Sequence, residues 1–190
     1  MTQAQPERAS GTRMLTAFGE TPAQIQAELH KAFGRFEAAI PDHQGHWLTS
    51  PAEGRWSPAQ VTEHVLLVNE NVARIVALLL SDTPLRAGPA VPGQTLDGKR
   101  LAPAGLEPGE GLPWDALEPR WQASRAVLDG VAARLEGADL TRRYFHPFLG
   151  EIDAHDWTRM VTFHLRHHCR QLAEGQPAGA ETAQPAGREA

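Results

Sequence analysis

The sequence predicts an all-α fold, a four-helix bundle, on three observations. Apolar residues recur at three- and four-residue spacing in four segments of about 20 residues each. No convincing alternation of apolar and polar residues, as in a half-buried strand, lies between them. Proline or glycine stands beside the ends of these segments, as is typical where helices begin and end. Four helices of this length imply a bundle.

The first predicted helix runs from Thr21 to Ile40. Thr21 is a suitable N-cap, and Pro22 stands at the first helical position, where a missing N–H costs little. Pro41 ends the helix. Its apolar stripe, which we expect to face the core, consists of Ile25, Leu29, Ala32, Phe33, Phe36 and Ile40.

The second predicted helix begins at Ser57 and Pro58, again a capping residue followed by proline, and ends near Leu80. One histidine falls among the apolar residues of its inward face. That face consists of Val61, His64, Val65, Val68, Val72, Ile75, Val76 and Leu79.

The third predicted helix runs from Trp114 or Asp115 to Leu135. Pro119 lies in its first turn, and Gly137 closes it. Its stripe consists of Leu117, Trp121, Val127, Leu128, Val131 and Leu135.

The fourth predicted helix runs from Asp153 to Leu172, between Gly150 and Gly175. Two histidines stand on its apolar stripe. The stripe consists of Trp157, Met160, Val161, His164, His168 and Leu172.

We expect one domain, residues 15–175, between a disordered N-terminus (1–14) and a disordered tail (176–190) rich in alanine, proline, glycine and glutamate. The connection 82–113 is rich in proline and glycine and much longer than a bundle usually needs. It either crosses the end of the bundle, over a pocket, or is a disordered insertion.

Composition limits the partners. The chain of 190 residues has 18 basic and 23 acidic residues, a formal net charge of −5, and no basic cluster, which disfavours nucleic-acid binding. Cys169 is the single cysteine, so no intramolecular disulfide can form, as fits the cytoplasm. Apolar runs such as 75–80 are far too short to span a bilayer, and residues 1–12 lack a signal peptide's apolar segment. We therefore expect a cytoplasmic protein without membrane or nucleic-acid partners.

The candidate site is formed by His64, His164 and His168. The last two are four residues apart, so both rings leave one helix face about one turn apart and can bind one ion. Three neutral imidazoles can hold a divalent metal and leave one coordination position open, as in catalytic sites. The alternative is three independent core histidines, each hydrogen-bonded to a neighbour. Periodicity alone favours neither.

Other polar residues near these histidines have lesser expected roles. Gln60 and Asn71 share the face of His64 and are expected to hold its tautomer. His167 points off the buried stripe and is expected to flank the site, while Cys169 is expected to be a small buried hydrophobe. The remaining histidines considered, expected at the surface or in loops, are His30, His43, His46 and His155.

The sequence lacks the motifs that several kinds of active site require. The chain has no glycine-rich phosphate loop and no serine nucleophile elbow. The Glu-x-x-His motifs of carboxylate-bridged di-metal bundles are missing from all four predicted helices. A di-metal site is therefore disfavoured.

Two stretches of this chain resemble the DinB/YfiT-like superfamily of metal-binding four-helix bundles. Residues 55–64, Arg-Trp-Ser-Pro-Ala-Gln-Val-Thr-Glu-His, are similar to the family's Trp-Ser/Thr-Pro opening of helix two, which ends in its first metal histidine. Residues 146–150, His-Pro-Phe-Leu-Gly, then Asp156-Trp157 and residues 164–172, are similar to its His-Pro-Phe-x-Gly loop and its His-x-x-x-His-x-x-Gln motif.

The resemblance implies an up-up-down-down bundle with a long crossover between helices 2 and 3, forming a homodimer. It implies one nickel, zinc or similar ion on His64, His164 and His168; iron, manganese and copper also suit imidazole ligands. It also implies enzymatic kin, which are thiol-dependent S-transferases using bacillithiol, mycothiol or glutathione, and a thiol-dependent isomerase.

Two functions are compatible with these residues and this resemblance. The first is a metal-dependent enzyme that activates a thiol for transfer to a small electrophilic substrate in detoxification; hydrolysis with activated water is a close variant. The second is a non-catalytic metal-binding stress-response protein, whose ion ties the second and fourth helices together. A DNA-binding function is disfavoured by the acidic balance.

Overall fold

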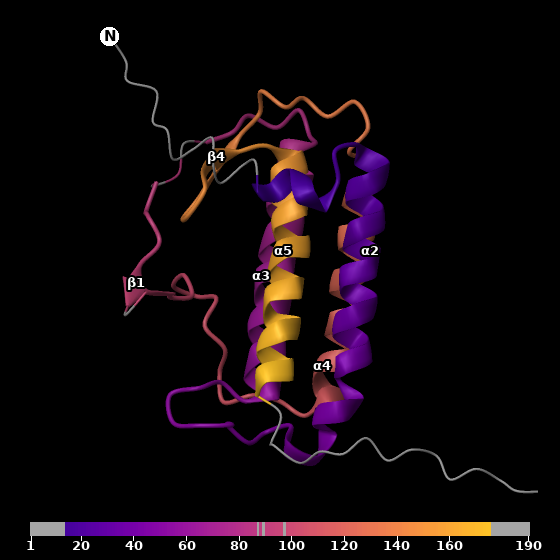
Figure 1. The fold of residues 1–190 in the computed structure, drawn as a ribbon. Helices are drawn as coiled ribbons and strands as arrows, with labels where there is room; N and C mark the ends of the chain where they lie inside the picture. The colour runs from indigo at the N-terminus through magenta and orange to yellow at the C-terminus, as the bar shows by residue number, and fades with distance from the viewer. Residues whose placement is uncertain (1–13, 87, 89, 97, 176–190) are drawn as a thin grey trace, which may run out of the picture.

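Four long helices form a bundle in the computed structural model, which describes residues 14–86, 88, 90–96 and 98–175 (Figure 1). They are α2 (Pro22–Ala39), α3 (Pro58–Leu79), α4 (Trp114–Ala132) and α5 (Ala154–Glu174). The predicted all-α four-helix bundle is confirmed. Disorder was predicted for residues 1–14 and 176–190. Of these, 1–13 and 176–190 lie outside the described residues, whereas Met14 is described and is helical. No helix in the described part of the chain is long and apolar enough to cross a membrane.

The starts of the helices follow the predicted caps. Thr21 accepts a hydrogen bond from the backbone N–H of Gln24, whose side chain in turn accepts from the backbone of Thr21. Ser57 and Gln60 form the same reciprocal capping box at the start of α3. Asp153 caps α5. These starts depend on local chemistry, so the sequence predicted them to within a residue.

In the view of Figure 1, α2 descends, α3 and α4 ascend, and α5 descends. Contacts between α2 and α4 agree with opposite directions. Glu37, near the end of α2, accepts from the Trp121 indole, whereas His30, in the middle of α2, meets Asp129 near the end of α4.

The other pairs of helices agree with the same order. Arg120 is paired with Glu70 in the middle of α3, and Arg134, just after α4, donates to the carbonyl of Leu80 at the end of α3. The two helices therefore run parallel. Likewise, α5 runs parallel to α2, because Arg159 near its start donates to the carbonyl of Gly19 before α2.

The order of directions is therefore down, up, up, down, and the up-up-down-down order implied by the resemblance is wrong. Residues 40–57 turn back at one end of the bundle, which makes α2 and α3 antiparallel. The connection 80–113 instead runs the full height of the bundle, so α4 begins at the same end as α3 (Figure 1). The long crossover between the second and third long helices is confirmed.

The described residues of this connection follow the side of the bundle along α3 rather than crossing its end (Figure 1). A short hairpin, β1 (Thr95–Leu96) and β2 (Lys99–Arg100), lies near its middle. A second hairpin, β3 (Tyr144–His146) and β4 (Gly150–Ile152), precedes α5. The sequence predicted no strands, because two or three residues are too few for a detectable alternation.

One continuous core fills the bundle. Trp121 lies at its centre, with no exposed surface, stacked on Phe36 at 5.0 Å between ring centroids and edge-on to Phe33 at 5.6 Å. The predicted stripes are buried or packed against this core with one exception. Val127 is 54% exposed, because α4 turns that side of its stripe to solvent, so its assignment to the core was wrong.

Two turns of 3-10 helix complete the fold. The first, η1 (Thr16–Phe18), leads into α2, and the second, η2 (Pro41–His46), follows it directly. Phe18 of η1 meets Phe163 of α5 edge-on, with ring centroids 6.1 Å apart. The described N-terminal residues thus pack against the same helix that carries two of the candidate histidines.

Candidate metal centre

The structure brings His64, His164 and His168 together between α3 and α5. The Nε2 atom of His164 lies 3.1 Å from Nε2 of His64 and 3.0 Å from Nε2 of His168. The potential ligand atoms of the three residues all lie within 4.8 Å of one another. Since His164 and His168 are four residues apart, one turn of α5 presents two rings to the single ring of α3. This arrangement can hold one metal ion.

Burial keeps the three rings neutral. His64 and His168 are buried, at 5% and 6% exposed. Loss of hydration lowers the pKa of His64, and it lowers the pKa of His168 to about 3, helped by the nearby His64 and His167. The pKa of His164 falls well below its ordinary value for the same reason, with His168 and His64 adding to the effect. Neutral imidazole is the form that binds metal.

Hydrogen bonds set the tautomers of two rings. Nδ1 of His64 lies 2.7 Å from the backbone carbonyl of Leu106, which can only accept, so Nδ1 carries the proton. Nδ1 of His168 donates in the same way to Oε1 of Gln171, 2.7 Å away. Nε2 of each ring therefore presents a lone pair toward His164.

His164 cannot satisfy both lone pairs. Its Nε2 carries at most one proton, and its buried Nδ1 has no hydrogen-bond partner among the described residues. Buried polar atoms are rarely left in this state. A cation among the three Nε2 atoms would accept all three Nε2 lone pairs at once, with the proton of His164 on its Nδ1, and three neutral imidazoles suit a divalent transition metal. The residues present therefore fit a mononuclear metal site.

Aromatic rings enclose the cluster. The Trp56 indole is tilted against His64, with centroids 4.9 Å apart. On the side of the β3–β4 hairpin, His146 packs on Trp157 at 5.0 Å, and its Nδ1 accepts from the backbone N–H of Phe148. Burial lowers the pKa of His146 to about 4, and the charge of Arg100 adds to this. His146 is close enough to His164 to lower its pKa.

The partners of the site histidines differ from those expected. Neither Gln60 nor Asn71 holds the tautomer of His64, so that prediction was wrong. The Gln60 side chain is used by the capping box and by the carbonyl of Gly109, and Asn71 is two helical turns from His64. Gln171 could have been identified as the partner of His168 from the sequence, because it lies three residues further on the same helix face. Nothing in the sequence identifies the backbone carbonyl of Leu106 as the partner of His64.

The remaining histidines lie outside the cluster. His167 is exposed and flanks it, as expected. His43 was predicted to be a surface or loop residue, but η2 folds inward and leaves it only 1% exposed, with Nδ1 3.1 Å from Nε2 of His46. His30 is exposed and pairs with Asp129, while His155 donates to the carbonyl of Leu135.

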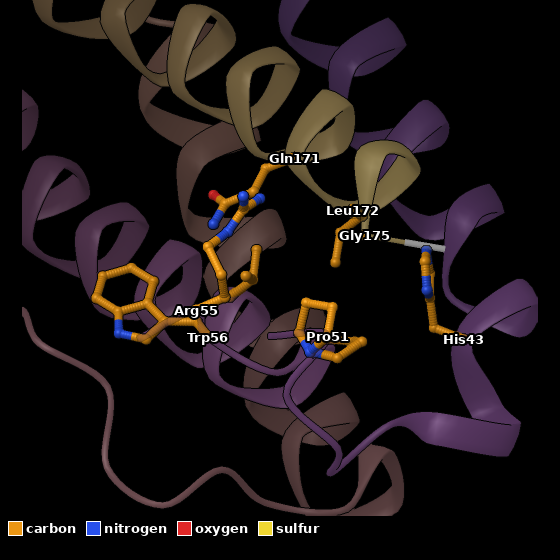
Figure 2. A pocket seen from close by; sticks show the side chains of 9 residues that line it. His43, Pro51, Arg55, Trp56, Gln171, Leu172 and Gly175 are labelled. Atoms are coloured by element: carbon orange, nitrogen blue, oxygen red, sulfur yellow. The ribbon is translucent and has the colours of Figure 1, made fainter. Parts of the chain in front are cut away.

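A hollow lies at the end of α5, as Figure 2 shows. It lies among the loop before α3, η2 and the last turn of α5. Gln171, which holds His168, and Trp56, which contacts His64, both line it. The full lining consists of His43, Pro51, Arg55, Trp56, Pro58, Val61, Gln171, Leu172 and Gly175.

Comparison with known families agrees with this geometry. The family model of the DinB superfamily matches residues 24–172, which include all four long helices almost completely. The chain belongs to the DinB superfamily. The match covers both helices that carry the candidate ligands. Within this DinB superfamily chain, Cys169 is half-buried, with Sγ 3.8 Å from the carbonyl of Arg35, and packs against the core much as expected.

A solved structure supports the fold of this DinB superfamily chain. It is similar to the crystal structure of TT2238, a four-helix bundle protein, with 23% sequence identity and a TM-score of 0.59. The likeness covers 81% of this chain and 99% of TT2238. At this identity the comparison shows the fold alone. No curated protein matches the chain.

Proposed function

We propose that this chain is a metal-dependent enzyme that activates a thiol for transfer to a small electrophile, an S-transferase of detoxification. The observation that carries the proposal is the convergence of three neutral imidazoles, two with their Nε2 lone pairs fixed inward, from His64, His164 and His168. A divalent ion on three such ligands lowers the pKa of a thiol or water in its open coordination position.

The protein's own residues prepare this position. Leu106 and Gln171 hold their histidines in the metal-binding tautomer before any ligand arrives. The three histidine ligands are neutral, so they leave the charge of a divalent cation uncompensated. The site therefore favours an anionic fourth ligand such as a thiolate. The Trp56 indole adds an apolar wall beside His64.

We further propose nickel or zinc as the ion, ahead of iron, manganese and copper, and bacillithiol, mycothiol or glutathione as the thiol. Imidazole ligands suit all five metals, so availability decides among them. We also propose that the protein is cytoplasmic and that it forms a homodimer. Sedimentation of the purified protein would test the dimer.

The test combines elemental analysis with an activity screen. The purified protein is loaded with each metal and mixed with each thiol and a panel of electrophiles, and loss of free thiol is followed. We expect one combination to react, and the reaction to stop on chelation and in His164→Ala. His167→Ala is the matched control, since its ring lies outside the cluster. A metal-loaded protein that consumes no thiol with any electrophile would contradict the proposal.

A non-catalytic metal-binding role is the second candidate. It is favoured by the placement of the ligands on two helices, because an ion bridging α3 and α5 would stabilise the fold whether or not catalysis occurs. The visible absorption spectrum of the Co²⁺-loaded protein separates the two. A spectrum unchanged by added thiol indicates a closed site, whereas a new thiolate-to-cobalt band supports the transferase. Cleavage of activated esters without thiol would instead favour the hydrolase variant.

A further inference from the structure

The last part of the α3–α4 connection, residues 106–112, is bound to the first turns of α3, and we call it the strap. Three hydrogen bonds join the two. The Gln60 amide donates to the carbonyl of Gly109 at 3.0 Å, and the N–H of Gly109 donates to Oε2 of Glu63 at 3.1 Å. His64 Nδ1 donates to the carbonyl of Leu106 at 2.7 Å. Three residues of the first two turns of α3, Gln60, Glu63 and His64, thus hold the strap's backbone, and the last of them is a candidate ligand.

Close packing supports these hydrogen bonds. Gly111 has a φ of +88°, and a Cβ there would lie 3.0 Å from Cβ of Ala59 and 3.4 Å from Cγ of Gln60. Glycine is therefore required both by the backbone conformation and by the close approach to α3. The Trp47 indole donates to the carbonyl of Leu112 at 2.8 Å and fixes the far end of the strap.

The position of the Leu106 carbonyl depends on this docking. Leu106 belongs to no helix or strand. Its N–H donates to the carbonyl of Pro103 at 2.9 Å, and its half-buried side chain packs against the core. Three residues further on, Gln60 and Glu63 engage both backbone polar groups of Gly109. The clamp at Gly109 thus holds the chain on the C-terminal side of the carbonyl that sets the tautomer of His64, and the Leu106–Pro103 hydrogen bond holds it on the N-terminal side.

We propose that Glu63 is a positioning residue of the metal centre, acting through the strap: by holding Gly109 it keeps the Leu106 carbonyl on His64, so that Nε2 of His64 presents its lone pair to the metal. This inference rests on the proposed metal centre. Partners that orient metal-binding histidines contribute about 10- to 100-fold to metal affinity. By reciprocity, a bound metal tightens the strap by the same factor.

The test compares Glu63→Ala with Glu63→Gln. The glutamine retains an oxygen that can accept from Gly109, whereas alanine does not. In metal-free protein with ¹⁵N-labelled histidine, we expect NMR to show His64 as the Nδ1–H tautomer in the wild type and in Glu63→Gln. In Glu63→Ala we expect a mixture of tautomers. Zn²⁺ affinity should fall about tenfold in Glu63→Ala and return in Glu63→Gln.

A second variant changes the strap and leaves the sequence of α3 as it is. Gly111→Ala should weaken Zn²⁺ binding and speed hydrogen exchange in residues 106–112. Gly54→Ala is the matched control, since Gly54 also has a positive φ, +70°, but a Cβ there would meet nothing within 4 Å. Zn²⁺ should slow exchange in the wild-type strap.

The inference is overturned if Glu63→Ala and Gly111→Ala keep one His64 tautomer and bind Zn²⁺ within twofold of the wild type. If the wild-type protein itself does not bind Zn²⁺ or any other ion, the metal centre fails instead. The tautomer comparison needs no metal and still decides whether Glu63 positions His64.

Discussion

The Nε2 atoms of His64 and His164, one hundred positions apart in the chain, face each other at 3.1 Å across the interface of α3 and α5. Neither helix has a site on its own, and the cluster exists only because the two helices pack side by side. Metal binding therefore depends on each of the three rings rather than on one local motif.

Removing any one of the three rings should remove the metal. We expect His64→Ala, His164→Ala and His168→Ala to be purified with little bound ion, because two imidazoles and water bind much more weakly than three imidazoles. His167→Ala should keep most of its metal. Elemental analysis of the four proteins, purified in parallel, measures this. A stoichiometric ion in His164→Ala would rule out the site.

The metal-free protein should lose stability as the pH falls below about 6.5. Histidines titrate near 6.5 in the unfolded chain, whereas burial lowers the pKa of His168 to about 3 in the folded protein. Between these values the unfolded state binds more protons, so the free energy of unfolding rises with pH by about 1.4 kcal/mol per unit for this group and levels off above 6.5.

Urea unfolding at several pH values, with a chelator present, measures that slope. His168→Gln should show a shallower dependence on pH than the wild type between pH 4 and 6.5, a range chosen from these pKa values. Equal slopes for the two proteins would show that His168 is not held neutral by the fold.

Arg159 should be important for stability. It is buried, at 8% exposed, pairs with Asp156 at 2.7 Å, and donates to the carbonyls of Gly19 and Glu20 before α2. Burial already raises the pKa of Asp156. We expect Arg159→Met to lower the free energy of unfolding by about 3 kcal/mol, because it leaves a buried carboxyl without its partner.

Chemical denaturation measures this loss, and Arg166→Met is the control. Arg166 is on the same helix but exposed, with its guanidinium 5.3 Å from the Phe18 ring centroid. A change below about 0.5 kcal/mol in Arg159→Met, within the usual range of surface substitutions, would contradict the prediction.

The indole N–H of Trp121 should stabilise the fold in addition to the packing of the indole ring. It donates to Oε1 of Glu37 at 2.8 Å, while Arg125 donates to the other carboxylate oxygen at 2.6 Å. Trp121→Phe should cost about 1–3 kcal/mol, because Glu37 loses a partner and the smaller ring leaves a void. Thermal unfolding beside Trp114→Phe, a half-buried neighbour 6.3 Å away, would show whether the loss is specific.

Features encoded locally were predictable from the sequence. The capping boxes at Thr21 and Ser57, the periodicity of the helices and the 4-residue spacing of His164 and His168 all act within a few residues. The approach of His64 to this pair was predictable as a hypothesis, because its place on an apolar stripe required a buried partner.

Features that depend on distant chain segments were not predictable in this way. Leu106 contacts His64 through its backbone, which carries no mark of residue type. His43 lies in a short polar segment whose burial is decided by how η2 folds against the bundle. Val127 fits the helical period, but the neighbouring helices, not the period, decide which edge of a stripe is covered.

The α3–α4 connection has far more chain than its span requires. Helix α3 has 22 residues and rises about 33 Å, a height that roughly ten extended residues can cover. Residues 80–113 exceed this about threefold, and the excess lies ahead of the strap, around the β1–β2 hairpin. Evolution can therefore lengthen, shorten or replace that stretch, and with it the outer rim of the site, while the three imidazoles keep their places.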